Sequence, residues 1–167
     1  MYDCIPYASP LGTLTIAAEN GALTALVIAG QKYEALHLAG EGREQETPVL
    51  HQAKAWLDRY FALERPDPSE LPLSPKGTAF QQRVWQELLR IPYGRTESYG
   101  SLAARLGSSA RAVGSAVGRN PLSIIIPCHR VLGADGSLCG YAGGLENKRK
   151  LLDLEGIRIT ERKDLLT

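Results

Sequence analysis

The sequence predicts an α/β protein in two parts, a small antiparallel sheet with one covering helix and then a mostly helical C-terminal part. Three observations support this prediction. Short β-prone runs separated by turn residues occupy residues 1–29, prolines interrupt residues 64–77, and helical patterns dominate from residue 78 onward. The chain has 167 residues, of which 44% are hydrophobic, so it can bury a core.

Composition excludes several classes of protein. No apolar stretch approaches the roughly 18 to 20 residues of a membrane helix. The N-terminus also lacks a basic segment before an apolar run, so we expect a cytoplasmic protein. The three cysteines, Cys4, Cys128 and Cys139, show neither CxxC spacing nor the cysteine and histidine spacing of a zinc site. We therefore expect no disulfide framework and no metal.

The N-terminal part should begin with a three-stranded meander. Residues 4–7, 13–18 and 23–28 are β-prone, and the turn signals of residues 9–12 and Asn20-Gly21 separate them. A helix is then expected to start at Thr47-Pro48 and to cover one face of the sheet. Its apolar residues recur at helical spacing, at Leu50, Ala53, Leu57 and Phe61.

Four prolines between residues 64 and 77 fit neither a helix nor a central strand, so we interpret this segment as a linker. It separates a predicted N-terminal domain, residues 1–77, from a C-terminal domain, residues 78–167. In the second domain Thr78 should cap a helix that runs to about Arg90. Two further helical patterns, residues 98–106 and 109–117, are joined by Gly107-Ser108. This spacing fits a helix-turn-helix, and an ordinary pair of core helices is the alternative.

The second of these helices is composed almost entirely of small residues. Arg111 and Arg119 are its only long polar side chains, whereas reading bases in the major groove needs several. Residues 78–167 carry 13 Lys and Arg against eight Asp and Glu, while residues 1–77 carry six against ten. If the helix binds DNA, it should therefore do so mainly through phosphates and with little sequence preference.

An apolar run at residues 123–126 reads as a strand that Pro127 interrupts just before Cys128 and His129. Neighbouring side chains on a regular strand point to opposite faces, so these two could share a site only if the backbone turned there. A nucleophilic cysteine needs a base such as His129, and the base needs a carboxylate to orient it. Glu155 is our candidate for that carboxylate, with three acidic residues left as alternatives. These are Asp135, Glu146 and Asp153.

Residues 126–131 (IPCHRV) resemble the active-site signature of the O6-alkylguanine-DNA alkyltransferases, also called methylated-DNA-protein-cysteine methyltransferases. Other motifs resemble the family in the same order, so that the resemblance covers essentially all of residues 78–160. They are FQQRVW (80–85), IPYG (91–94), SYG (98–100), ARAVG (110–114), NP (120–121), GYAGG (140–144) and LEG (154–156). The resemblance implies a ribonuclease-H-like N-terminal domain and a winged-helix-like C-terminal domain that contains the helix-turn-helix.

The resemblance also implies the reaction and its residues. Cys128 matches the nucleophile, which takes the alkyl group from the guanine oxygen once and keeps it. His129 matches the residue that activates the thiol through water, and Glu155 the carboxylate that orients it. Asn120 matches a supporting residue, and Tyr99 the phenol that protonates the leaving guanine. No cofactor is implied.

The implied partner is duplex DNA that carries O6-alkylguanine, bound in the minor groove largely without regard to sequence. Arg111 matches the finger that fills the gap left by the flipped base. The other implied DNA-contacting residues are Ser98, Tyr99, Ala110, Ala112, Gly114 and Arg119. The implied base pocket is formed by Val131, Tyr141, Ala142 and Gly143. We expect a monomer and leave cooperative binding along the duplex open.

Two rival interpretations come from other functional classes. In the first, the chain is a helix-turn-helix module that binds lesions without transfer. In the second, Cys128, His129 and Glu155 form a cysteine hydrolase, which would turn over and would not need DNA. Cys139 is interpreted as a structural bystander.

Overall fold

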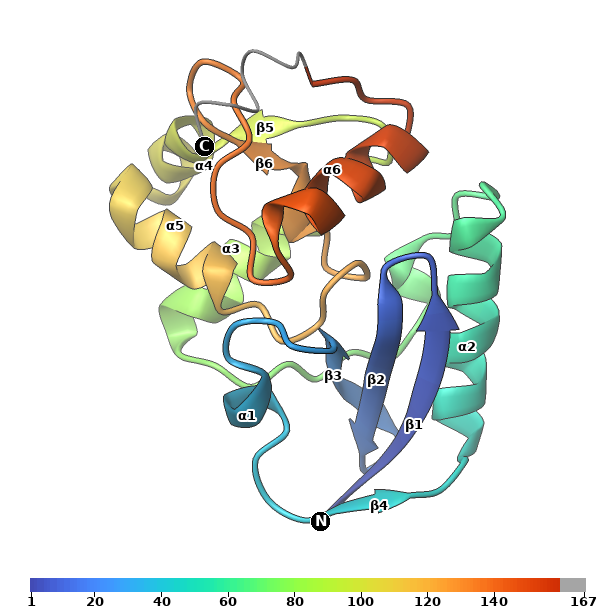
Figure 1. Cartoon of the computed structure of the whole chain (residues 1–167). Helices are drawn as coiled ribbons and strands as arrows, with labels where there is room; N and C mark the ends of the chain where they lie inside the picture. Colours follow the sequence, from blue (N-terminus) through green and yellow to red (C-terminus); the bar gives the residue numbers. More distant parts are fainter. Residues whose placement is uncertain (160–167) are drawn as a thin grey trace. The chain divides into compact units, whose positions relative to one another are not determined.

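The computed structural model describes residues 1–159, and it divides into two compact units (Figure 1). The first unit comprises Met1–Lys76 and Pro121–Ile125, and the second comprises Gly77–Asn120 and the chain from Ile126 onward. The end of the predicted C-terminal domain, residues 160–167, lies outside the described residues. None of the helices within residues 1–159 is long and apolar enough to cross a membrane.

The sheet of the first unit contains the predicted meander and one further strand. The strands β1 (Tyr2–Ser9), β2 (Gly12–Glu19) and β3 (Ala22–Ile28) are antiparallel neighbours, as predicted. The sequence prediction of three strands was nevertheless incomplete, because β4 (Gly42–Glu44) pairs in parallel with β1. The three residues of β4 are exposed and have no β-strand pattern of their own, so backbone pairing with β1 at the sheet edge holds them in an extended conformation.

The predicted helix that covers the sheet is α2 (Pro48–Phe61) (Figure 1). It begins as expected, because the Thr47 hydroxyl accepts a hydrogen bond from the Leu50 amide. Leu50, Ala53 and Leu57 are buried, whereas Phe61 is only half-buried. A short helix, α1 (Glu34–His37), was not predicted.

The proline-rich segment is not a free linker. It contains a short 3₁₀-helix, η1 (Pro68–Glu70), and then runs along the edge of the sheet. The Leu23 amide donates to the carbonyl of Pro72, and the Ser74 amide donates to the carbonyl of Leu23, each at 2.8 Å. The prolines are tolerated there because an edge position does not require every residue to donate.

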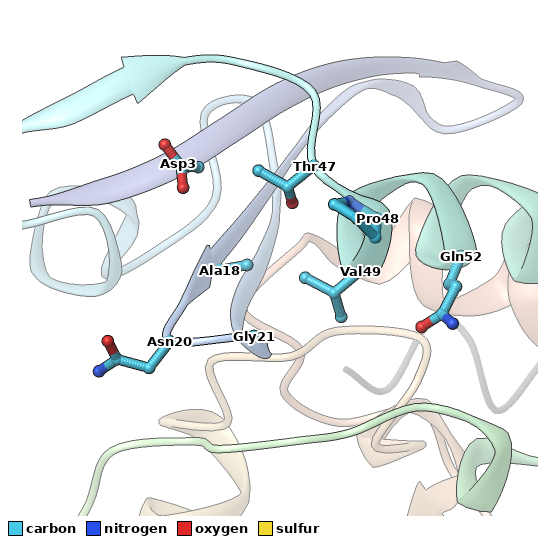
Figure 2. Close-up of a pocket in the computed structure, with 8 residues that line it drawn as sticks. All are labelled: Asp3, Ala18, Asn20, Gly21, Thr47, Pro48, Val49 and Gln52. Atoms are coloured by element: carbon cyan, nitrogen blue, oxygen red, sulfur yellow. The ribbon is translucent and has the colours of Figure 1, made fainter.

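A pocket of about 380 Å³ lies in the first unit, between the start of α2 and the nearby ends of the sheet strands (Figure 2). Its one acidic side chain, Asp3, is already ion-paired with Arg43 at 2.9 Å. The pocket contains none of the predicted site residues. Its lining residues are Asp3, Ala18, Asn20, Gly21, Thr47, Pro48, Val49 and Gln52.

The second unit is mostly helical, as predicted. Helix α3 (Ala79–Leu88) begins with a capping box between Thr78 and Gln81. Helices α4 (Tyr99–Leu106) and α5 (Ala110–Gly118) follow, with Gly107 between them in the left-handed conformation at φ 63°. The unit also contains α6 (Leu145–Leu154), and a two-stranded parallel sheet that the sequence did not predict. This sheet pairs β5 (Glu97–Ser98) with β6 (Val131–Leu132).

The prediction of a strand at residues 123–126 is wrong. The segment is buried but turns, and Ile124 has a φ of 73°, which no regular strand allows. Residues 121–125, which the sequence analysis placed in the C-terminal domain, belong to the first unit. The Leu26 amide donates to the carbonyl of Pro121, and the Ser123 amide donates to the carbonyl of Leu26. An apolar run shows that a segment is buried, but it does not distinguish a strand from a buried turn.

Candidate active site

Cys128 and His129 lie together on a short 3₁₀-helix, η2 (Cys128–Arg130), which begins directly after Pro127. This is the turn that the sequence analysis required if the two side chains were to serve one site. On a 3₁₀-helix successive side chains are about 120° apart rather than on opposite faces. Both residues are buried, and so is Arg130.

The Cys128 thiol is buried, and burial favours its protonated form. Burial raises the pKa of this thiol, whereas a hydrogen bond from the Asn120 side chain and the nearby Lys148 ammonium oppose the increase. The Asn120 amide also donates from Nδ2 to the carbonyl of Ile126 at 2.8 Å, which fixes its orientation. The sulfur therefore needs a base before it can act as a nucleophile.

His129 is anchored by a carboxylate at the end of α6. Its Nε2 lies 2.6 Å from Oε2 of Glu155, and both side chains are fully buried. The structure thus selects Glu155 and excludes the three alternatives, Asp135, Glu146 and Asp153, from this position. Burial lowers the pKa of His129 although Glu155 acts in the opposite direction, so the imidazole is neutral at pH 7.

Glu155 has further donors besides His129, and one of them is Arg130, for which the sequence predicts a structural ion pair. Arg130 donates to it from Nε at 2.7 Å and from Nη2 at 3.0 Å, and the Gly94 amide donates at 3.2 Å. Burial alone would raise the pKa of Glu155, but the hydrogen bonds from His129 and Arg130 hold it well below its usual range. The carboxylate is therefore ionised and can only accept, so His129 carries its proton on Nε2.

That tautomer leaves Nδ1 of His129 as a basic nitrogen. This atom is buried and has no hydrogen-bond partner among residues 1–159. It can accept a proton, either directly or through water. A buried thiol, a neutral imidazole and an ionised carboxylate that orients it are the groups that thiol activation requires.

Tyr99, the first residue of α4, lies in the same site. Its hydroxyl donates to the carbonyl of Cys139 at 3.0 Å. Burial and the neighbouring thiols of Cys139 and Cys128 raise the pKa of Tyr99, so it keeps its proton near neutral pH. A Cβ added at Gly114 of α5 would stand 3.7 Å from the Tyr99 ring, which places this glycine beside it.

Lys148 is the site residue that sequence reasoning missed. It is fully buried in α6, and its Nζ donates to the carbonyls of Val131, Gly140 and Cys139. In the sequence it opens a run of three basic residues, which resembles a solvent-exposed face. The signal that could have revealed it is helical spacing, because Lys148 lies three residues after Leu145 and three before Leu151.

The residues implied in DNA binding lie on the helix-turn-helix, where three are exposed and four, including Ser98 and Tyr99, are half-buried. Ser98 caps α4 by accepting a hydrogen bond from the Ser101 amide. Arg111 lies exposed in the first turn of α5, and Arg119 lies exposed just after its end. Ala110 is exposed beside Arg111, and two other implied residues, Ala112 and Gly114, are half-buried.

Of the residues implied in the base pocket, Val131 is buried and follows η2 directly. Tyr141, Ala142 and Gly143 form a turn that leads into α6, closed by a hydrogen bond from the Gly144 amide to the carbonyl of Tyr141. The turn is fixed to α6 as well, because Asn147 donates to the carbonyl of Gly143 at 2.8 Å.

A helix-turn-helix, a buried cysteine and a buried histidine–glutamate pair lie in one unit, and this combination indicates a DNA-binding protein with a reactive cysteine. Comparison with known families agrees with this. The family model of the 6-O-methylguanine DNA methyltransferase DNA-binding domain matches residues 79–157. The model of the ribonuclease-like domain of the same proteins matches residues 4–75. The chain belongs to the 6-O-methylguanine DNA methyltransferase family.

Individual relatives support the same assignment. A methylated-DNA-protein-cysteine methyltransferase of Mycobacterium leprae is 47% identical over 157 residues, which covers 93% of each chain. The constitutive enzyme of Bacillus subtilis is 48% identical over 158 residues, 92% of this chain and 95% of its own. The structure resembles Mycobacterium tuberculosis OGT in complex with DNA, with a TM-score of 0.82 and 44% identity over 92% of this chain and 93% of that one.

Proposed function

We propose that this protein repairs DNA by direct reversal, transferring the alkyl group of O6-alkylguanine irreversibly to Cys128. The observation that carries the proposal is the buried Cys128 thiol in the same unit as a neutral His129, whose Nε2 is held 2.6 Å from Glu155. Membership of the 6-O-methylguanine DNA methyltransferase family supplies the substrate class.

The first step is activation of the thiol. His129 Nδ1 takes the proton of Cys128 through water, and Glu155 stabilises the resulting imidazolium. Asn120 donates to the sulfur and so favours the thiolate. Arg130 keeps Glu155 ionised throughout, because its guanidinium donates twice to the carboxylate.

Transfer itself is an in-line displacement. The Cys128 sulfur forms a bond to the alkyl carbon while the bond between that carbon and the guanine O6 breaks. The electron pair of the broken bond stays on guanine, and the Tyr99 hydroxyl donates a proton to the ring as this charge develops. The product thioether on Cys128 is stable, so each molecule acts once.

The base must leave the duplex before it can reach Cys128. We propose that α5 enters the minor groove and that Arg111 fills the gap. Ser98, Ala110, Ala112, Gly114 and Arg119 contact the neighbouring backbone. The flipped base is held between Val131 and the turn at Tyr141, Ala142 and Gly143. The small residues of α5 let the helix backbone come close to the groove wall, which supports binding without sequence preference.

In this proposal residues 78–167 bind DNA and transfer the alkyl group, and residues 1–77 support them. The protein acts in the cytoplasm as a monomer, on duplex DNA and without a cofactor. The test mixes the protein with an equimolar duplex that contains one O6-methylguanine, and intact-protein and peptide mass spectrometry then follow each cysteine. One methyl group on Cys128, restored DNA and no reaction of Cys128→Ala are expected. A bound duplex with unmodified cysteines would instead identify a lesion-binding module.

A further inference from the structure

Lys148 is a buried charge that the proposed transfer does not use. Its side chain is fully buried in α6, and Nζ donates to the carbonyl oxygens of Val131 at 2.6 Å, Gly140 at 3.0 Å and Cys139 at 3.1 Å. An ammonium group has three N–H donors, so these carbonyls use all of them. Burying a charge is costly unless it is fully hydrogen-bonded, and here three oxygens compensate for it.

The three carbonyls belong to two segments that bound the proposed base pocket. Val131 follows η2 and starts β6. Cys139 and Gly140 immediately precede the turn at residues 141–143. Through Lys148, α6 holds both segments at one point. The distance between the two walls therefore depends on this ammonium group as well as on the contact between Asn147 and Gly143.

Lys148 also lies next to the proposed acid. Its Nζ is 5.9 Å from the centre of the Tyr99 ring, and both side chains donate to the same carbonyl, that of Cys139. To protonate guanine, the Tyr99 hydroxyl must leave this carbonyl. The oxygen then still has Lys148 as a donor, so the movement leaves no carbonyl without a hydrogen bond. Without Lys148, the same movement would leave the carbonyl of Cys139 without a hydrogen bond. The Tyr99 hydroxyl would therefore stay bound to that carbonyl.

We propose that Lys148 is a positioning residue that sets the width of the base pocket and releases Tyr99 to act on the base. This inference rests on the proposed function. It predicts that Lys148 matters for reactions in which a guanine occupies the pocket, and much less for the intrinsic reactivity of the Cys128 sulfur.

The test compares Lys148→Met, which removes the donors at similar length, with Lys148→Arg, which retains charge and donors. Lys150→Met is the matched control, because Lys150 is exposed on the same helix. Two rates are measured at Cys128 by peptide mass spectrometry. One is methyl transfer from free O6-methylguanine, which needs the pocket, and the other is alkylation by iodoacetamide, which does not.

For Lys148→Met we expect the transfer rate to fall on the order of tenfold or more, which corresponds to one lost charge-assisted hydrogen bond. The iodoacetamide rate should fall less than the transfer rate, because it reports only the loss of the Lys148 charge beside the Cys128 thiol. Lys148→Arg should retain more transfer than Lys148→Met, and Lys150→Met should match the unmodified protein. Equal losses in both rates, or unchanged transfer, would overturn the inference. If the unmodified protein transfers from neither the free base nor a duplex, the proposed function itself fails.

A measurement on the unmodified protein covers the case in which Lys148→Met does not fold. The ratio of the methyl-transfer rate to the iodoacetamide rate is followed from about pH 6.5 to about pH 9. Because both reactions use the Cys128 thiolate, the ionisation of Cys128 cancels in this ratio. Burial lowers the pKa of Lys148 to about 8. Above that pH the neutral amine has only two N–H donors, so the ratio should fall. Tyr99, Cys128, Cys139 and His129 are the titratable groups that face Lys148. Cys139→Ser should leave the profile unchanged, and a flat ratio would overturn the inference.

Discussion

Replacing Glu155 by glutamine removes the negative charge at the centre of the buried network and changes the size of the side chain very little. Three charge-related contacts are affected: His129 Nε2 at 2.6 Å, Arg130 Nε at 2.7 Å and Arg130 Nη2 at 3.0 Å. The Arg130 guanidinium would then be a buried cation without a carboxylate. Its remaining contacts are the carbonyl of Ile91 and the ring of Tyr93.

Breaking a buried ion pair from one side costs about 3–5 kcal/mol of unfolding free energy, a large share of the total of a typical domain. With a urea slope of about 1–3 kcal/mol/M, the unfolding midpoint of Glu155→Gln should fall by about 1–5 M. The rate of transfer should fall on the order of 100-fold, because His129 loses its orienting anion. Asp153→Asn, an exposed acid on the same helix, is the control for both measurements.

The double variant Glu155→Gln with Arg130→Met separates stability from reactivity. It removes both charges, and an apolar replacement of a buried pair is often close to neutral. We therefore expect the double variant to recover about 2 kcal/mol relative to the sum of the single changes, a coupling that a double-mutant cycle measures. Transfer should not recover. A midpoint of Glu155→Gln equal to that of the unmodified protein would refute the reasoning, and so would strictly additive losses.

Three further predictions concern DNA, pH and packing. Arg111→Ala should reduce repair of a duplex more than transfer from the free modified base, and equal losses would exclude a role in base extrusion. Burial lowers the pKa of His129, and its partners hold the pKa of Glu155 well below its usual range, so the unfolded chain binds more protons in acid. Urea titrations should show stability falling as pH decreases from about 6.5 to below about 4, whereas stability constant over this range would contradict the assignment. Gly77→Ala would place a methyl group against a buried indole ring and should cost about 1–3 kcal/mol. Gly118→Ala, in an open helical position, should be neutral or stabilising by up to about 1 kcal/mol, and thermal unfolding of both variants measures the difference.

Elements with local signals could be predicted from the sequence. The meander follows from β-prone runs and turn residues, and the helix-turn-helix follows from Ser98, Gly107 and Ser109, which cap its helices in the structure. Strand β4 could not be predicted, because its three residues are held only by pairing with β1. The apolar run at residues 123–126 led to a wrong strand prediction because its local signal is strong but has another cause. Its hydrophobicity reflects burial in a turn that contacts β3, and a local pattern does not record that contact.

The site residues also differ in whether a local sequence signal identifies them. Groups that react directly, such as Cys128 and His129, are adjacent in sequence, and the chemistry of a nucleophile and its base identifies them. From spacing alone Glu155 is one of four candidate acids, because spacing does not reveal which carboxylate a fold will deliver. The resemblance to a known family favours it, and the structure places its Oε2 at 2.6 Å from Nε2 of His129. Lys148 is harder still, since its partners are backbone carbonyls that any residue type could present. Groups that position a site through the main chain therefore leave almost no mark in a sequence, and only the fold that gathers their acceptors can reveal them.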